Sequence, residues 1–511
     1  MKAFLKTIGF DRRSGETNER ITELPALEEA GFDHIVEDHV IGIYPAFSFQ
    51  TLEGFGCAMT ESACFLLSGM PEEQRRETLS LWFGPEEGKA RLIRIPMDSC
   101  DYSLSPYQAV ADPLADPELK TFSIDRDRKY ILPVVKEALA LSGGKLSVLL
   151  SPWSPPWQWK TPPLKRKNDA AAYGGQEASA AAEPSRNNGG SLKPKYYGAW
   201  AEYLVKYVQA YLDEGIPVTM LSVQNESAAA TPWDSCVWSG AQEKSFLRDH
   251  LIPAMKAAGL YRKLEIFIWD HNKERIIENI EEMMDTETAG MVDGFAYHWY
   301  TGDHFEALSM LAAKYPDKIL MHSESCPRHR PGRVTSADLD PEELRKRPRA
   351  ALAPEELAVL TKSADKTPRD VDLEDAFAYA HDILGDLKGG MQRWIDWNLI
   401  VDSDGGPRHV SGGFTAPLVL DQKGSVIRTV SFEYLRMIME AIPAGSVRIG
   451  CSGFGPSVET AAVRRPDGSL SVILLHCGQE PEFVNLRIDG FVLSAELPGE
   501  SLSCITAVRN G

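Results

Sequence analysis

The sequence has 511 residues, of which 43% are hydrophobic and 25% are charged, and its formal net charge is −19. This length suits a large domain with a smaller companion and allows a sizeable hydrophobic core. Uniform acidity without a dense Lys/Arg stripe argues against nucleic acids and anionic membrane surfaces as partners.

Targeting and cofactor signals are missing from the sequence. The amino terminus lacks the apolar region of a secretory signal, and no run approaches the roughly 18 apolar residues that cross a bilayer. We therefore expect a cytoplasmic protein without membrane insertion. The eight cysteines form no CxxC pair, and HExxH, GxGxxG and Walker motifs do not occur, so we expect neither a metal nor a cofactor. Nothing in the sequence indicates an oligomeric state.

In chain order, short apolar runs alternate with longer segments of helical periodicity, of which Tyr196–Glu214 and Asp375–Leu387 are the clearest. This alternation predicts parallel βα units closed into a (β/α)8 TIM barrel, a fold of the α/β class. The expected strands are Glu53–Thr60, Ala90–Pro96, Lys145–Ser151, Val218–Val223, Leu264–Trp269, Gly294–His298, Lys318–His322 and Gln392–Leu399.

Two segments interrupt this rhythm. Lys165–Gly190 is rich in small and polar residues and predicts a long loop. Pro331–Arg369 is strongly charged, with short helices expected at Pro341–Lys346 and Pro354–Thr361. It is either a solvated insertion or a rim element that narrows a substrate site.

After Ala441 the pattern changes to period two, which predicts an additional discontinuous antiparallel β-sandwich domain. A PDGS hairpin turn lies at Pro466–Ser469, and the apolar run His39–Phe49 is expected to join this domain. We therefore divide the chain into an amino-terminal segment 1–49, a barrel 50–430 and a sandwich 431–511. The expected sandwich strands are Val447–Gly450, Glu459–Arg464, Leu470–His476, Glu482–Leu486 and Ser501–Val508.

Two glutamates stand at the ends of expected barrel strands. Glu226 follows the fourth strand in LSVQNES, and Glu324 follows the seventh in ILMHSES. One such glutamate would ordinarily be a solvated loop residue. Two together favour catalysis, because glycosidases use a carboxyl pair and barrel enzymes place catalytic groups at the carboxyl ends of strands.

Seven blocks in order resemble glycoside hydrolase family 30, and most closely its glucosylceramidase branch. The resemblance runs from about Gln50 to the carboxyl terminus, interrupted by the two segments above. The blocks are EGFGCAMTESA, RIPMDSCDYS, LLSPWSPPWQWKT, SVQNES, AYHWY, HSESC and RWIDWNLIVDSDGGPRH.

The resemblance implies that Glu226 is the general acid/base and Glu324 the nucleophile of a retaining enzyme. Asn225 would then bind the sugar 2-OH, and Asp101 and Trp153 would line a glucose subsite. Alternatively, Asp101 caps a helix and Trp153 packs the barrel rim.

Five further residues are expected to bind substrate. Trp397 and Asn398 match the eighth-strand motif beneath the sugar, and Trp397 would stack on a sugar face. His298 matches a family site position, although a core histidine is the alternative reading. The remaining two are Tyr300 and Trp233. The family usually has proline after the acid/base, whereas this chain has serine.

These residues predict hydrolysis of terminal β-D-glucosides through a covalent glycosyl-enzyme, with the nucleophile ionised and the acid/base protonated in the free enzyme. The alternatives are a β-xylosidase, a β-fucosidase or a β-1,6-glucanase of the same family. A catalytically inactive carbohydrate-binding protein is a further alternative, but the presence of both glutamates argues against it. The aglycone stays open.

Overall fold

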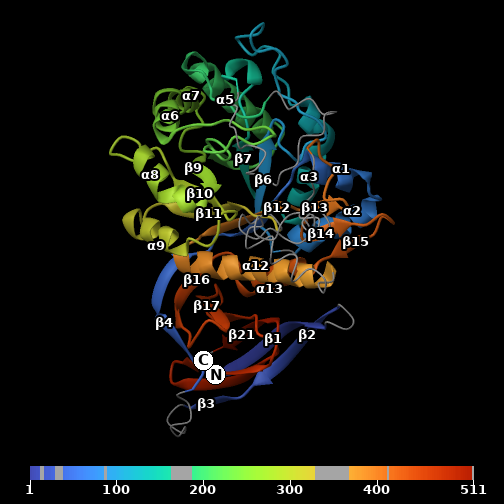
Figure 1. The fold of residues 1–511 in the computed structure, drawn as a ribbon, viewed down its shortest axis with the longest axis vertical. Helices are drawn as coiled ribbons and strands as arrows, with labels where there is room; N and C mark the ends of the chain where they lie inside the picture. The colour runs from blue at the N-terminus through green and yellow to red at the C-terminus, as the bar shows by residue number, and fades with distance from the viewer. Residues whose placement is uncertain are drawn as a thin grey trace, which may run out of the picture.

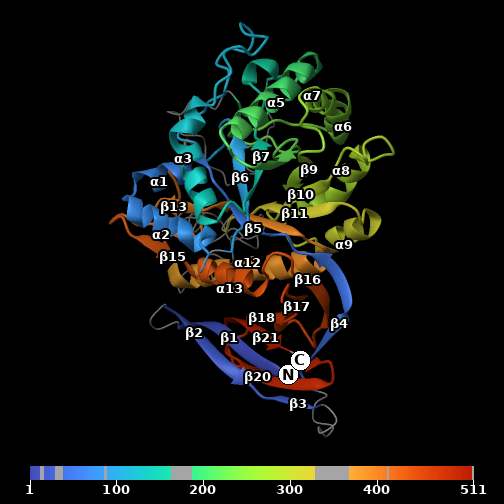
Figure 2. The same cartoon turned by 180° about the vertical axis from the view of Figure 1, so that it is seen from behind.

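The computed structural model describes residues 1–11, 16–28, 38–85, 89–162, 187–327, 368–410 and 414–508. The predicted loop Lys165–Gly190 and the charged segment Pro331–Arg369, with its two short helices, lie largely outside these ranges and stay predictions. A barrel and a β-sheet unit are stacked along the long axis, with two helices between them (Figures 1 and 2).

Eight parallel strands close the barrel in the order β5 to β12 around the ring. Each expected strand is present with its ends moved by only a few residues, so the predicted barrel is confirmed. Their near-continuous apolar character fits strands that are buried on both faces. They are β5 Gly54–Ala58, β6 Leu92–Met97, β7 Ser147–Pro152, β8 Val218–Ser222, β9 Glu265–Asn272, β10 Gly294–His298, β11 Ile319–Glu324 and β12 Arg393–Asn398.

Helices surround the strands and bury one face each. In α5, Trp200, Leu204, Tyr207 and Tyr211 recur at helical spacing and are fully buried. The helices are α1 Glu61–Gly69, α2 Glu72–Phe83, α3 Asp125–Leu141, α5 Tyr197–Asp213, α6 Gly240–Phe246, α7 Ile252–Ala257, α8 Ile276–Met283, α9 Phe305–Lys314 and α12 Pro368–Gly389. Three short 3-10 turns are η3 Trp157–Trp159, η4 Pro194–Tyr196 and η6 Lys273–Arg275, and a π-helical stretch, η5 Leu247–Leu251, joins α6 to α7.

The barrel interior is packed with side chains and is not a channel. Seven of the eight strands each contribute one apolar residue to a buried interior cluster. These residues are Leu92, Leu149, Met220, Phe267, Ala296, Met321 and Ile395. The filled interior leaves the two mouths of the barrel as the places where polar groups gather.

The second unit is a ten-stranded sheet with the order β2-β1-β21-β18-β17-β16-β4-β19-β20-β3. As expected, the run that begins at His39 forms a strand, β4, that pairs with β16, so both ends of the chain build this unit. The strands are β1 Lys2–Asp11, β2 Glu16–Leu24, β3 Ala26–Glu28, β4 Val40–Thr51, β16 Val447–Ser452, β17 Val458–Arg464, β18 Leu470–His476, β19 Glu482–Ile488, β20 Phe491–Leu497 and β21 Ser501–Val508.

The sheet differs from expectation in two respects. Strands β1, β2, β3 and β20 were not among the expected strands, and β4 pairs with β19 in parallel although the other pairings in this sheet are antiparallel. The division at residues 49/50 and 430/431 stays a prediction.

Because successive side chains of a strand point to opposite faces, the sheet contributes residues to two separate hydrophobic cores. In β18, Ile473 and Leu475 belong to the large core of the barrel and its helices, whereas Val472 and Leu474 belong to a separate core within the sheet unit. The helices that lie between the barrel and the sheet are α12 and α13, the latter spanning Val430–Ala441 (Figure 1). The two units are therefore joined by a continuous apolar interface.

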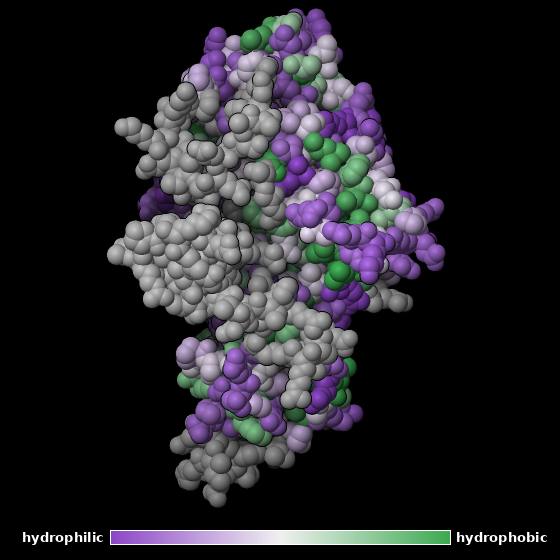
Figure 3. Space-filling view, turned by 45° about the vertical axis from the view of Figure 1, so that its right-hand side comes forward, coloured by the Kyte–Doolittle hydropathy of each residue, from purple (hydrophilic) through white to green (hydrophobic). Residues whose placement is uncertain are grey.

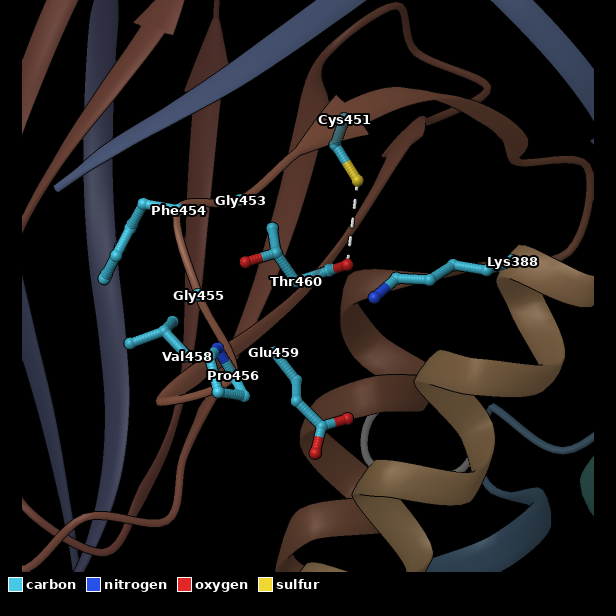
Figure 4. Close-up of a pocket in the computed structure, with 9 residues that line it drawn as sticks. All are labelled: Lys388, Cys451, Gly453, Phe454, Gly455, Pro456, Val458, Glu459 and Thr460. Atoms are coloured by element: carbon cyan, nitrogen blue, oxygen red, sulfur yellow. Dashed lines mark hydrogen bonds between the residues drawn. The ribbon is translucent and has the colours of Figure 1, made fainter. Parts of the chain in front are cut away.

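Polar contacts also cross this interface. His381 on α12 lies 2.7 Å from a Glu459 oxygen on β17 and 3.1 Å from Asp303. Beside it is a cavity of about 430 Å³, into which Lys388 reaches from α12 (Figure 4). A small sheet of β13 Ile400–Asp402, β14 Leu418–Leu420 and β15 Val426–Arg428 completes the described elements.

The described surface carries mixed polarity. On the face drawn in Figure 3, hydrophobic residues are scattered among hydrophilic ones. Within the described ranges, no helix combines the length and apolarity that a bilayer crossing requires.

Candidate active site

The carboxyl ends of the barrel strands bring the two predicted glutamates together. Glu324 is the last residue of β11, and Glu226 lies just beyond the end of β8. The two nitrogens of one imidazole ring lie between the glutamates: His298 Nδ1 is 3.5 Å from Glu226 Oε1, and its Nε2 is 3.9 Å from Glu324 Oε2. The two carboxyl groups therefore flank one small space.

Glu324 is held from two sides. The Arg94 guanidinium donates to its Oε2, and the Tyr300 hydroxyl donates to its Oε1 at 2.9 Å. The side chain is only 9% exposed. An ion pair and a hydrogen bond at separate oxygens fix the orientation of the carboxylate, as an attacking group requires.

Glu226 sits on a strained backbone. Its φ of +48° is in the left-handed region, as are those of Trp269 (+74°) and Asp270 (+46°). The Glu226 N–H donates to the Asp270 carbonyl at 2.8 Å, which ties the strained residues of the two strand ends together. Such conformations cost roughly 1–3 kcal/mol each and persist only where the surroundings enforce them, which is common at functional sites.

The charges around Glu226 act against its expected protonation. Burial raises the pKa of Glu226, but His271 and His298, at 3.6 and 3.5 Å, outweigh burial and hold that pKa well below its usual range. Burial lowers the pKa of His298, yet Glu324, Asp270 and Glu226 raise it to about 9. These directions favour an ionised Glu226 beside a protonated His298, the reverse of the expected arrangement, and the protonation of the acid/base in the free enzyme stays a prediction.

Asp270 is the hub of the site and was missed by sequence reasoning. Its Oδ2 accepts from Arg94 (2.8 Å), Ser151 (2.7 Å) and Ser222 (2.6 Å), and its Oδ1 contacts His298 (3.1 Å) and Ser323 (2.6 Å). These partners come from five other strands. Burial raises the pKa of Asp270, but Arg94, His298 and Ser222 together hold it well below its usual range.

Arg94 was also missed, although it lies within one of the recognised blocks. It is fully buried and donates to Glu324, Asp270, Ser151 and Asn225. The available signal was a charged residue inside an otherwise apolar strand, because burying an arginine is tolerated only where carboxylates pair with it. The same reasoning applies to His271, which follows Asp270 in β9.

Two of the predicted sugar-binding residues, Trp153 and Trp397, form a wall beside Arg94, and a third, Asp101, lies near Glu324. Trp153 stacks on Trp397 with ring centroids 5.1 Å apart, and the Arg94 guanidinium lies 4.8 Å from the Trp153 ring. Asp101 is 5% exposed and makes no hydrogen bond to the described residues. Burial and the nearby Glu324 charge raise the pKa of Asp101 to about 7, although Arg408 and His409 oppose them.

The predicted amide residues are both bonded to the scaffold. Asn225 Oδ1 accepts from Arg94 at 2.7 Å, which leaves its NH2 group for a ligand. Asn398 Oδ1 accepts from Thr60 at 2.9 Å, and its buried Nδ2 has no partner in the described residues. Trp233 is half-buried in the loop between β8 and α6, and its substrate role stays a prediction.

Two groups of side chains in the described residues are spaced closely enough for a metal ion. One is Glu226 with His271 and His298; the other is His322 with Asp382 and Asp386. In the second group the Lys273 ammonium pairs with both aspartates, at 2.7 and 3.0 Å. The ammonium therefore stands where a metal ion would otherwise balance their negative charge. In the first group, the protonated His298 cannot also donate a lone pair to a metal from Nδ1.

A TIM barrel that holds two carboxyl groups, one buried and one partly buried, at the ends of two of its strands is typical of a glycoside hydrolase. The chain belongs to glycosyl hydrolase family 30: the profile of that family's TIM-barrel domain matches residues 52–340 and 333–427, and its β-sandwich profile matches residues 445–503. The resemblance inferred from the seven blocks is confirmed.

The names of similar proteins fall into two groups, glucosylceramidases and endo-1,6-glucanases. The chain is 26% identical to "Putative glucosylceramidase 4" of Caenorhabditis elegans over 84% of its length and 75% of that protein. It is 26% identical to mouse "Lysosomal acid glucosylceramidase" over 86% of its length and 78% of that protein. "Endo-1,6-beta-D-glucanase" of Neurospora crassa is 27% identical, over 50% of the chain and 49% of that protein.

Among solved structures, SrfJ from Salmonella typhimurium superposes with a TM-score of 0.80 and 27% identity, covering 100% of both chains. The agreement extends over both units and supports the fold described above.

Proposed function

We propose that this glycoside hydrolase is a retaining β-glycosidase of terminal β-D-glucosides, with Glu324 as nucleophile and Glu226 as general acid/base. The carrying observation is that both carboxyl groups flank the His298 ring at the carboxyl mouth of the barrel. The contacts from Arg94 and Tyr300 orient the Glu324 carboxylate, which supports its role as the attacking group.

The first step forms a bond between Glu324 and the sugar C1 while the glycosidic C1–O bond breaks. His298 Nδ1 passes its proton to the Glu226 carboxylate, which gives it to the leaving oxygen as the C1–O bond breaks. The charge of Glu324 contributes most to the raised pKa of His298. Because esterification removes that charge, the imidazole releases its proton more readily as the nucleophile attacks.

The second step reverses these roles. Glu226 takes a proton from a water molecule, whose oxygen attacks C1 and breaks the ester bond to Glu324. The returning charge on Glu324 restores the higher proton affinity of His298, which recovers the proton by way of Glu226. Each turnover thus ends with the charge distribution of the free enzyme.

Glucose is the proposed glycone. The free Asp101 carboxyl and the amide of Asn225 suit sugar hydroxyls, and relatives named glucosylceramidase support the choice. Asp101, Trp153, Trp397, Asn398, His298, Tyr300 and Trp233 remain the proposed substrate-binding residues. Cleavage of glucosylceramide and a cytoplasmic location stay predictions.

A β-1,6-glucanase is the second candidate, because two relatives carry that name. Parallel assays on nitrophenyl β-glucoside, β-xyloside and β-fucoside and on β-1,6-glucan separate the candidates. We expect the glucoside to be cleaved fastest; a preference for the glucan would favour the second candidate.

Mechanism is tested separately from substrate choice. We expect Glu226→Ala to lose about 10²–10⁴-fold in kcat/KM on an alkyl glucoside, much less on dinitrophenyl glucoside, and to regain activity with azide as a β-glycosyl azide. Glu202→Ala, an exposed change on α5, is the control. An α-configured first product from the wild-type enzyme, or full activity of Glu226→Ala on the alkyl glucoside, would refute the mechanism.

A further inference from the structure

Two cavities lie away from the glutamates, and their charges differ. The cavity between α12 and the β16–β17 hairpin, drawn in Figure 4, is lined by one ammonium, Lys388, and one carboxylate, Glu459. Glu459 is already paired with His381. This cavity is close to electrically balanced and carries no argument for a charged ligand.

The second cavity opens at the amino mouth of the barrel, opposite the active site. Its volume is about 470 Å³, within the range of small-molecule sites. Its walls come from residues at or near the starts of β5, β6, β7, β9 and β12. The charged residues that line it are Glu53, Arg91, Lys145, Lys263, Glu265 and Arg393.

Both carboxylates in this cavity pair with the same arginine. Arg393 Nε donates to Glu53 at 2.8 Å, and its NH2 group donates to Glu265 at 3.0 Å. Arg393 itself is buried, with a side chain only 7% exposed, and lies over the Phe267 ring. The floor of the cavity is therefore a fixed ion-pair cluster.

The other three cations have no such partner. Within the described ranges, no carboxylate oxygen lies within 4.0 Å of the charged nitrogens of Arg91, Lys145 or Lys263, and the guanidinium of Arg91 donates only to a backbone carbonyl at 2.7 Å. Four cations against two carboxylates leave the cavity two positive charges in excess. In a chain of net charge −19, this local excess is the reverse of the global balance.

We propose that the amino mouth of the barrel is a binding site for a small multivalent anion of the phosphate or polycarboxylate type. A guanidinium fork and two flexible ammonium groups around one concavity suit an anion with several oxygens, because each group can donate to a different oxygen. The inference is independent of the proposed function, since the barrel core separates this cavity from the glutamates.

The test is calorimetric titration of the full chain with inorganic phosphate and, separately, citrate, at ionic strength held constant with sodium chloride. We expect saturable binding of at least one anion, weakened tenfold or more in the double variant Lys145→Ala/Lys263→Ala. The control Lys2→Ala/Lys423→Ala removes the same charge from exposed positions elsewhere and should bind like the wild type.

A preference between the two anions distinguishes a phosphate-type from a carboxylate-type ligand, and either supports the site. Circular dichroism and hydrolysis of a nitrophenyl glycoside check that the variants fold. Two results overturn the proposal: no wild-type binding beyond that of chloride, or equal affinity in the wild type and the Lys145/Lys263 variant.

Discussion

The two mouths of the barrel contain the same arrangement with different outcomes. At the carboxyl mouth Arg94 pairs with Asp270 and Glu324, and at the amino mouth Arg393 pairs with Glu53 and Glu265. The carboxyl-mouth carboxylates are 0% and 9% exposed, whereas those at the amino mouth are 38% and 36% exposed. Burial strengthens every charge interaction, so only the first cluster perturbs its neighbours enough for chemistry.

The largest expected difference is in turnover. Glu324→Gln keeps the shape of the side chain but removes the charge, so we expect kcat to fall by about 10³-fold or more. Glu265→Gln, the matched change at the amino mouth, should leave kcat within about twofold. Steady-state hydrolysis of a nitrophenyl glucoside measures both. Equal losses would mean that the charge at either mouth serves only the fold.

Replacing Arg94 or Arg393 should lower the free energy of unfolding by different amounts. Arg94→Met leaves buried carboxylates unpaired, and we expect a loss of roughly 3–5 kcal/mol in the free energy of unfolding. Arg393→Met leaves two partly hydrated carboxylates and should cost roughly 1–2 kcal/mol. Urea unfolding at neutral pH compares them, and an Arg393 variant as damaged as the Arg94 variant would contradict the role given to burial.

The pH dependence of kcat/KM should respond to changes at the carboxyl mouth and not to changes at the amino mouth. Because the pKa of His298 is raised to about 9, the proton needed for catalysis is present below that pH and lost above it. We expect the alkaline limb of kcat/KM near pH 9, since kcat/KM follows the free enzyme. In His298→Gln the limb should shift to lower pH, whereas Glu265→Gln should leave it unchanged. A wild-type limb near pH 6 would place the proton on Glu226 instead.

The smallest effect is expected at the junction of the two units. Glu459 and Asp303 raise the pKa of the partly exposed His381, although burial opposes them. The folded state therefore favours the protonated ring, so its contribution is complete below about pH 6.5 and fades as the pH rises through the raised pKa. We expect His381→Gln to lose at most about 1 kcal/mol at pH 5.5 and nothing at pH 9, measured by urea unfolding. A loss independent of pH would assign His381 to packing.

Strand positions were predictable because each barrel strand is a compact apolar run, and both glutamates were found because polar residues end such runs abruptly. The expected fifth strand stopped at Trp269, whereas β9 continues to Asn272 and carries Asp270 and His271. As at Glu226, polar residues follow an apolar strand directly after Trp269, so Asp270 and His271 could have been identified by the same signal. Strand β20 was missed because its apolar residues do not alternate cleanly.

The protonation of Glu226 could not be predicted from sequence. It depends on His271 and His298, which reach the acid/base from two other strands. Distances of this kind arise only when the ring closes, and a few tenths of an ångström change their electrostatic effect. The two glutamates could therefore be identified from the sequence, whereas the protonation of Glu226 depends on neighbours that only the folded barrel brings together.

Asp270 draws its partners from β6, β7, β8, β10 and β11. Together with β9, which carries Asp270 itself, these strands make up six of the eight around the ring. A folding intermediate in which any of the six is unpaired would therefore lack part of the catalytic centre even if every helix had formed. Recovery of hydrolysis during refolding would then report when these six strands have assembled.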